Sequence, residues 1–299
     1  MSDQSVAAVT VDRVSVSYGK RLAVDDVTFA VPGGCVYALL GRNGAGKSSL
    51  VRCILGQQKP QRGAIEIFGE DAWRHRASLM ERVGIVAEEA DAPPEMRVGA
   101  IGRFCSRLYA RWDAKAFEDR IARFAIPLGA RFGDLSKGQK KQVALALALA
   151  SAPDLVILDD PTLGLDVVAR KSLFEEVISE LADRGITILI TTHDLAGVET
   201  IADRVGILVD GKLVLDEELE TVKARFRRAR TAARAVALTN ANVATAAVRA
   251  WGSGTEAVVT NYDEAAFETF RTGGESVEIS PMSLEDIFVS VVGEEGARQ

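Results

Sequence analysis

Cysteine, histidine and long apolar runs are all scarce in this chain of 299 residues. Its three cysteines, Cys35, Cys53 and Cys105, lie far apart and form no CxxC pair, which disfavours metal ribbons and redox motifs. We therefore expect reduced core thiols in a cytosolic protein. The longest apolar stretch, at residues 143–152, is about half of the roughly 20 residues that a membrane-spanning helix needs. If this protein serves a membrane process, another chain has to cross the membrane.

A targeting signal and a strong excess of charge are also missing. The start, MSDQSVAAVTVDRVS, has neither a basic segment nor an apolar core, so we expect no secretory signal. The net charge of −6 favours solubility and gives no general attraction to nucleic acid or to an anionic membrane. The apolar share of 47% is typical of a globular protein, and the length allows a main domain with a smaller one.

The order of strand and helix patterns predicts an α/β fold. Short apolar segments at residues 35–40 and 155–159 are typical of buried strands, and a helix is expected at 167–182. Interleaved strands and helices favour a layered structure with a mainly parallel sheet. Helical patterns from about 98 to 152 predict a helical lobe inserted into this structure.

A change in composition marks a domain boundary after residue 222. We assign residues 1–222 to the main domain, with a helical subdomain at about 90–152, then a linker at 223–235 and a small α/β domain at 236–299. Beyond the linker, a βαβαβα order with no obvious chemistry is suggested by the successive segments RAVALTN, ANVATAAVRAWG, EAVVTN, EAAFETFR, SVEIS and SLEDIFVSVV. For the basic residues near the boundary we favour a solvated helix or linker over a patch for an anionic partner; they are Lys223, Arg225, Arg227, Arg228, Arg230 and Arg234.

A glycine-rich loop carries the most specific chemistry. GRNGAGKSS at residues 41–49 matches G-x-x-x-x-G-K-[ST] between a predicted strand and a predicted helix. The glycines permit a tight loop whose N–H groups point inward, and the following helix adds its positive end. We expect Lys47 to reach the β- and γ-phosphates of a nucleotide and Ser48 to bind Mg²⁺. The flanking strand and helix disfavour the alternative, a glycine-rich turn with a chance lysine. The residues expected at the nucleotide are Gly41, Arg42, Asn43, Gly44, Ala45, Gly46, Lys47, Ser48 and Ser49.

Two aspartates end the apolar segment LVILDD at residues 155–160. Asp159, at the end of a buried strand, can bind Mg²⁺ directly or through water. Many buried strands end in an acid, so this segment alone is weak evidence. Together with the loop at 41–49 it indicates a nucleotide site.

A third motif, LSKGQ at residues 135–139, precedes a helix and lies about 20 residues before LVILDD. With the other two motifs it resembles the LSGGQ signature of ABC transporter ATP-binding subunits, with Lys137 in place of the middle glycine. In that family the loop caps the γ-phosphate held by the other subunit, which implies contacts from Ser136, Lys137, Gly138 and Gln139. An ordinary helix N-cap is the alternative that the residues leave open. The resemblance covers roughly residues 8–220 and implies an ABC-type P-loop NTPase cassette with an antiparallel β-subdomain and the inserted helical subdomain.

Further positions match the family by resemblance. Tyr18 sits where the family places the aromatic residue that stacks on adenine; a core or edge-strand tyrosine is the alternative. Asp166 in LGLD resembles the D-loop at the subunit interface, and His193 in TTHD resembles the switch histidine that contacts the γ-phosphate. Glu88 falls where the family usually has the Q-loop glutamine, and its carboxylate could reach Mg²⁺ or the attacking water with an added charge. The other histidine, His75, is interpreted as a surface residue.

LSKGQ, LYARWD and the tail SPMSLEDIFVSVV resemble the ATPases of bacterial exporters for drugs, peptides or polysaccharides. One set of motifs and no membrane span imply half a transporter. Two copies, or this chain and a relative, are expected to pair head to tail around two ATP molecules with Mg²⁺. The family sets the segment through residues 107–113 against a separate integral membrane permease, which implies a peripheral position on the inner face of the cell membrane. A nucleic-acid-linked ATPase is disfavoured, since those generally carry two cassettes or a long coiled coil.

Asp160 departs from the family pattern, which has a glutamate there to polarise the attacking water. Aspartate keeps the carboxylate but is shorter by one carbon–carbon bond, about 1.5 Å. An error of ~1 Å at a reacting centre can cost on the order of 10²-fold in rate. Since His193, Ser136, Gly138 and Asp166 are retained, we favour a working, slower ATPase. The alternative is an ATP-gated regulatory or assembly module with weak or no hydrolysis.

Overall fold

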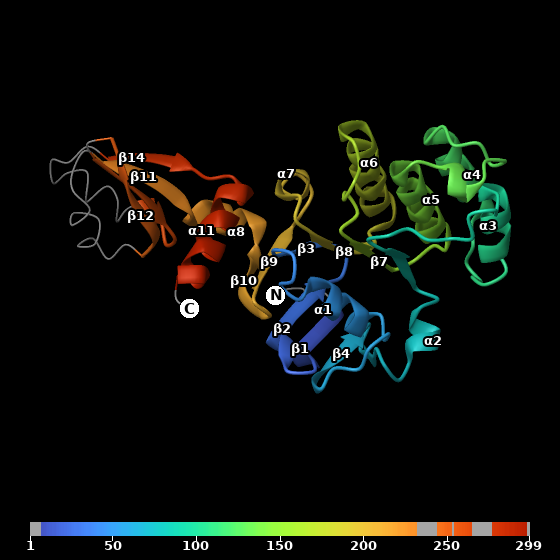
Figure 1. Cartoon of the computed structure of the whole chain (residues 1–299), viewed down its shortest axis with the longest axis horizontal. Helices are drawn as coiled ribbons and strands as arrows, with labels where there is room; N and C mark the ends of the chain where they lie inside the picture. The colour runs from blue at the N-terminus through green and yellow to red at the C-terminus, as the bar shows by residue number, and fades with distance from the viewer. Residues whose placement is uncertain (1–6, 232–243, 253, 265–276, 298–299) are drawn as a thin grey trace.

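The computed structural model describes residues 7–231, 244–252, 254–264 and 277–297. Its centre is a sheet of strand order β10-β9-β3-β8-β7-β6, parallel except for the β9–β10 hairpin (Figure 1). β3, β7 and β8 are buried along nearly their whole length, as a parallel sheet covered on both faces requires. The strands are β3 (Val36–Leu40), β6 (Val83–Val86), β7 (Leu155–Asp159), β8 (Thr187–Thr192), β9 (Arg204–Val209) and β10 (Lys212–Glu218). The predicted parallel core is confirmed.

An antiparallel sheet of order β2-β1-β4-β5 lies below the central sheet in Figure 1. Helix α1 (Lys47–Ile54) lies between the two sheets and belongs to one buried cluster with Leu39, Ile157 and the inward valines of β1 and β2. Alternation of buried and exposed residues along these strands gives the sheet one apolar face. The remaining elements here are β1 (Ala7–Tyr18), β2 (Arg21–Pro32), β4 (Arg62–Ile67), β5 (Glu70–Asp71) and α2 (Arg76–Leu79).

Helices α3 to α6 form the other end of the molecule, on the right of Figure 1. Apolar side chains such as Ile101, Phe117 and Leu145 join them to the central sheet in one buried cluster. The bounds are α3 (Val98–Cys105), α4 (Ala114–Arg123), a 3₁₀ turn (Phe132–Asp134), α5 (Lys137–Ala150), α6 (Val167–Arg184) and α7 (Leu195–Val198). No helix among the described residues is both long and apolar enough to span a bilayer.

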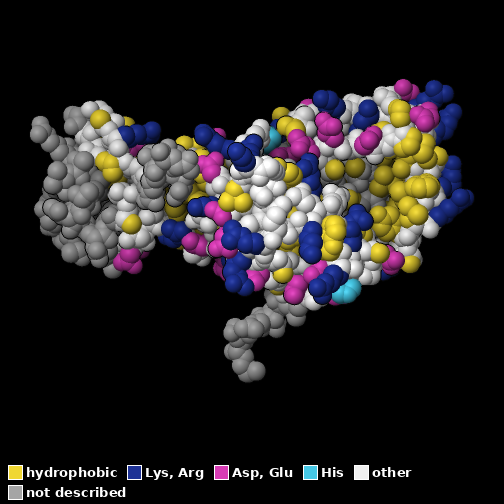
Figure 2. Space-filling view, turned by 60° about the horizontal axis from the view of Figure 1, so that its bottom comes forward, with side chains coloured by type: hydrophobic (Ala, Val, Ile, Leu, Met, Phe, Trp, Pro, Cys, Tyr) yellow, Lys and Arg dark blue, Asp and Glu magenta, His cyan; other side chains and the backbone are white. Residues whose placement is uncertain are grey.

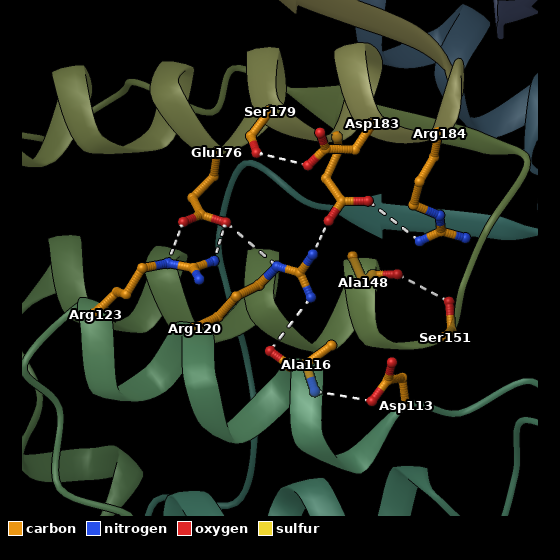
Figure 3. A network of polar contacts seen from close by, with 11 residues as sticks. Asp113, Ala116, Arg120, Arg123, Ala148, Ser151, Glu176, Ser179, Asp183 and Arg184 are labelled. Carbon is orange, nitrogen blue, oxygen red and sulfur yellow. Dashed lines mark hydrogen bonds and ion pairs between the residues drawn. The ribbon is translucent and has the colours of Figure 1, made fainter.

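Buried charges also tie α4 to α6 (Figure 3). The side chain of Arg120, 8% exposed, lies between Glu176, at 3.3 Å from Nε, and Glu180. Arg123 pairs with Glu176 at 2.8 Å, and Arg184 pairs with Glu180 at 3.2 Å. Burial lowers the pKa of Arg120 below its usual value, and the attraction of Glu176, which by itself would raise that pKa, does not outweigh the effect of burial. These ion pairs anchor the helical lobe on the helix that follows the LGLD segment.

The last part of the chain contains an antiparallel sheet of order β12-β13-β11-β14, on the left of Figure 1. Its elements are α8 (Leu219–Arg225), β11 (Arg227–Thr231), β12 (Thr245–Trp251), β13 (Gly254–Val259), β14 (Val277–Pro281) and α11 (Leu284–Ala297). Most of the segment predicted as a linker, 223–235, instead forms the end of α8 and strand β11. Its arginines have partners in the fold: Arg225 binds Glu217 and Arg230 binds Glu256. Arg234 and the strand expected near 234–240 lie outside the described residues. So does nearly all of the helix expected near 264–271.

The helix expected within ANVATAAVRAWG is instead strand β12. Its alanines favour a helix, but pairing along β13 outweighs that weak local preference. Arg249 lies opposite Glu256 and donates to its carboxylate at 2.5 Å. Downstream, α11 turns back onto the main core: Leu284 and Ile287 are fully buried there, and the Leu284 N–H donates to Glu199 at 3.1 Å.

Candidate active site

The loop between β3 and α1 is closed by a glycine in a conformation that other residues avoid. Gly46 has φ +112°, and a Cβ there would lie 2.4 Å from the carbonyl oxygen of Ala23. Gly46 caps α1 without a side-chain hydrogen bond, and the first turn of α1 contains no acidic residue. The first N–H groups of a helix have no partner within it and carry its positive end. This loop therefore presents a cradle that suits an anion such as a phosphate.

Lys47 stands at the base of this cradle. Its side chain is 5% exposed, and Nζ donates to the carbonyl of Gly41 at 2.8 Å. The same nitrogen lies 4.0 Å from Oδ2 of Asp160. A buried ammonium held by its own loop places a fixed positive charge where the loop amides converge.

A cavity of about 530 Å³ opens over the loop. Gly41 and Ala45 are buried in the loop itself, and Asp159, which is half-buried, does not line this cavity. Three further lining residues were not predicted: Arg21, Ala23 and Leu163. Arg21, three residues after Tyr18, donates to the carbonyl of Gly44 at 3.4 Å, and no sequence motif indicates this contact. The predicted residues that line the cavity are Tyr18, Arg42, Asn43, Gly44, Gly46, Lys47, Ser48, Ser49, Glu88, Asp160 and His193.

Tyr18 contributes an aromatic ring at one side of the cavity. The residue is 45% exposed at the end of β1, and its hydroxyl donates to Gln58 at 2.7 Å. Tyr37, by contrast, is a fully buried core tyrosine. Part of the Tyr18 ring is therefore open to a planar ligand, and the alternative that Tyr18 is a core residue is wrong.

Thr191 on β8 holds both acids at the end of β7. Its hydroxyl donates to Asp159 Oδ1, and its carbonyl accepts the N–H of Asp160 at 2.8 Å. Burial raises the pKa of Asp159 above its usual value, opposed by the hydrogen bond from Thr191 and reinforced by the neighbouring Asp160. β8 lies between β3 and β7, so it brings the acids beside the glycine-rich loop.

Asp160 reaches the cavity through an unusual backbone conformation. Its φ is +43°, a left-handed value that costs a residue other than glycine about 1–2 kcal/mol and that aspartate tolerates better than most. Oδ1 accepts from the ring nitrogen Nδ1 of His193 at 2.8 Å and from the His193 N–H at 3.2 Å. The carboxylate is 9% exposed, between His193 and Lys47.

Lys141 on α5 is a neighbour of this group that no motif predicted. Its ammonium is buried and donates to the carbonyl of Asp160 at 2.5 Å. Burial lowers the pKa of Lys141, against the attraction of the carboxylates of Asp160, Glu88 and Asp159. The signal was available in the sequence: with Leu145 and Leu149, Lys141 follows a four-residue spacing, which places it on the buried stripe of α5.

The LSKGQ segment lies apart from the loop cavity. Ser136 caps α5, accepting from the Gln139 N–H at 3.2 Å, while the Gln139 side chain accepts from the Ser136 N–H at 3.0 Å. The helix N-cap that the sequence left open as the alternative is thus present, as a capping box. Asp166 caps α6 by accepting from the Ala169 N–H at 2.8 Å. A second hollow contains Ser136, Lys137, Gly138, Gln139, Gly164 and Asp166, and these residues do not line the loop cavity.

A phosphate cradle between a buried strand and a helix, with acids at the end of another parallel strand of the same sheet, defines a P-loop nucleotide-binding cassette. The ABC transporter family model matches residues 24–163. The Nod factor export ATP-binding protein I of Paraburkholderia xenovorans (strain LB400) is 36% identical over 215 residues, 70% of each chain. The bacitracin transport ATP-binding protein BcrA of Bacillus licheniformis is 32% identical over 213 residues, 71% of this chain and 70% of BcrA.

Solved structures agree with these relatives. An ATP-binding subunit of an ABC transporter superposes with a TM-score of 0.67 at 30% identity, covering 73% of this chain and 92% of that one. CbiO1 from Clostridium perfringens gives 0.64 at 28% identity, covering 73% and 91%. The chain belongs to the ABC transporter family, as an ATP-binding subunit of the exporter type. The predicted family and fold class are confirmed, and ATP binding comes with the family.

Proposed function

We propose that this chain hydrolyses ATP to drive a separate membrane subunit of a bacterial exporter. One observation carries the hydrolytic part: the short side chain of Asp160 lies in the cavity, 2.8 Å from His193 and 4.0 Å from Lys47. A carboxylate paired with an imidazole beside a phosphate cradle suits the positioning of an attacking water.

The cavity residues divide the work between binding and chemistry. Lys47 and the amides at the start of α1 hold the phosphates, and the open ring of Tyr18 takes the adenine. The carboxylate of Asp160 orients the attacking water. His193 holds this carboxylate in place and also faces the γ-phosphate. These roles rest on the placement of the side chains.

Mg²⁺ fits the donor set at the edge of the cavity. Ser48 and Glu88 line the cavity, and Asp159 ends β7 directly before the lining residue Asp160. In the part of the chain that the structure describes, no three His, Cys, Asp or Glu side chains form a metal site by themselves. Mg²⁺ is typically held by one or two carboxylates together with the phosphates of a substrate, and it neutralises their charge. We assign Ser48, Asp159 and Glu88 to this ion.

Two chains are needed to complete the site. The LSKGQ segment and Asp166 share a hollow that is separate from the loop cavity of the same chain. A head-to-tail pair places the LSKGQ helix N-terminus of each chain over the phosphates held by the other. The partner is a second copy of this chain or a related cassette.

The helical lobe offers a surface for the membrane subunit. Hydrophobic side chains gather at this end of the molecule (Figure 2). Phe104, Leu108 and Leu128 are 56%, 59% and 39% exposed. An apolar patch on a surface otherwise rich in charge is typical of a protein contact site. We place the permease at this patch, with the cassette peripheral on the inner face of the membrane.

The division of the chain into a cassette at 1–222 and an accessory domain stays a prediction.

ATP turnover by the full chain beside D160N and D160E tests hydrolysis. We expect D160N to lose turnover by on the order of 10²-fold or more while it still binds ATP. D160N as fast as the wild type, with D160E much faster, would favour the ATP-gated module instead. Co-purification with an integral membrane subunit tests the transport assignment, and a chain that never associates with one would count against it.

A further inference from the structure

Lys141 is a buried lysine with no place in the two hollows of the nucleotide site. It is 4% exposed and lines neither the loop cavity nor the hollow at LSKGQ. Its side chain runs from α5 to the end of β7, where Nζ donates to the carbonyl of Asp160 at 2.5 Å. A buried ammonium is costly to keep, so its position calls for a specific partner. That partner is the peptide of the proposed catalytic acid.

The backbone of Asp160 is held from both sides. On one side its N–H donates to the carbonyl of Thr191 at 2.8 Å, with the Thr191 hydroxyl at 3.3 Å. On the other side its carbonyl accepts from Lys141. A left-handed residue persists when its surroundings fix it, and here φ is +43°. Because φ sets the direction of the Cα–Cβ bond, the same two contacts set where the carboxylate lies.

We propose that Lys141 is a positioning residue for Asp160, holding the peptide whose left-handed turn brings the short carboxylate to His193. This inference rests on the proposed hydrolytic role of Asp160. Lys141 stands one turn into the helix that Ser136 caps, so it joins the start of the LSKGQ helix to the acid at the end of β7.

The test compares K141M, K141R and K140M in the full chain. Methionine has nearly the same length as lysine but no donor, and arginine keeps a cationic donor. Lys140, the next residue, faces the ring of Phe132 at 5.5 Å instead of the acids and serves as the matched control. For each variant, kcat and KM of ATP hydrolysis are measured, together with the Kd of a fluorescent ATP analogue.

We expect K141M to lower kcat by about 10- to 100-fold while Kd changes by less than about threefold, because only the placement of Asp160 is lost. K141R should recover part of the turnover, and K140M should match the wild type. The double variant K141M/D160N should be no slower than D160N, since Lys141 acts through Asp160.

The outcomes separate this inference from the proposed function. D160N that turns over ATP like the wild type would refute the hydrolytic role, and the inference with it. Slow D160N beside a K141M of normal kcat would overturn the inference alone. Equal losses of affinity and turnover in K141M and K141R would also overturn it, because Lys141 would then support the fold in general. If K141M does not fold, K141L, which also has no donor, takes its place in the same comparisons.

Discussion

Nδ1 of His193 lies 2.8 Å from Oδ1 of Asp160, and the His193 backbone N–H donates to the same oxygen at 3.2 Å. An ionised carboxylate only accepts, so Nδ1 carries the proton in this contact and the ring orientation is fixed by it. The other carboxylate oxygen, Oδ2, is left on the side of Lys47. Histidine and aspartate thus form one unit at the end of two neighbouring parallel strands.

Replacing His193 should therefore impair turnover more than binding. We expect H193A to lower kcat by on the order of 10²-fold, because the carboxylate of Asp160 loses its orienting partner and the γ-phosphate loses a contact. ATP affinity should fall much less, since Lys47 and the loop amides are unchanged. Steady-state ATP turnover and titration with a fluorescent ATP analogue measure the two effects. H75A is the control, because His75 is an exposed histidine away from the cavity; an H193A variant as fast as H75A would contradict the assignment.

Gly46 should not tolerate even alanine. Its φ of +112° and the 2.4 Å approach of a Cβ to the Ala23 carbonyl force the loop to shift. Strain of about 1–3 kcal/mol in the loop that holds the phosphates corresponds to a loss of roughly 5- to 150-fold in ATP affinity. The same titration measures it. Gly69 has a similar φ of +80° with open space around it, so G69A controls for backbone strain without a clash at the site; G46A binding ATP as well as G69A would refute the prediction.

The sequence was enough to predict those parts of the site that a single short segment forms by itself. The loop at 41–49 and Asp159 follow directly from a strand, a turn and a helix in order, so local pattern was enough. Lys141 and Thr191 could not be assigned in the same way, because their contacts with Asp160 span 19 and 31 residues. Strand β12 was missed for a related reason: its partner, β13, decides its conformation, whereas its own residues favour a helix.

The ion pairs between α4 and α6 should make Arg120 important for stability. In R120M, Glu176 and Glu180 lose a shared buried partner, and removal of one member of a buried network typically costs about 3–5 kcal/mol. Urea unfolding measures the change. K115M is the control: Lys115, 85% exposed, pairs with Asp119 on the surface of α4, where water screens the two charges, so K115M should unfold at nearly the same urea concentration as the wild type. A loss in R120M no larger than in K115M would show that Arg123 and Arg184 satisfy both glutamates.

Glu256 should make the stability of the C-terminal sheet depend on pH. It is 3% exposed on β13 and accepts from Arg230 at 2.8 Å and from Arg249 at 2.5 Å. Burial alone would raise the pKa of Glu256, but the hydrogen bonds from these arginines outweigh it, and the pKa is lowered. A carboxylate with a lowered pKa in the folded state stabilises the fold above its unfolded pKa, and this contribution is lost as the pH falls through the folded value.

E256Q should consequently be less stable than the wild type at neutral pH, by about 1–3 kcal/mol for the lost charged hydrogen bonds. The difference should stay constant down to about pH 5 and shrink below about pH 4, where the wild-type carboxyl also becomes neutral. Thermal unfolding of both proteins between pH 3 and pH 8 (roughly the span of the titration) measures it. E66Q, at an exposed position of β4, is the control and should show no such dependence. A difference that persists unchanged in acid would mean that the amide itself, and not the charge, disturbs the sheet.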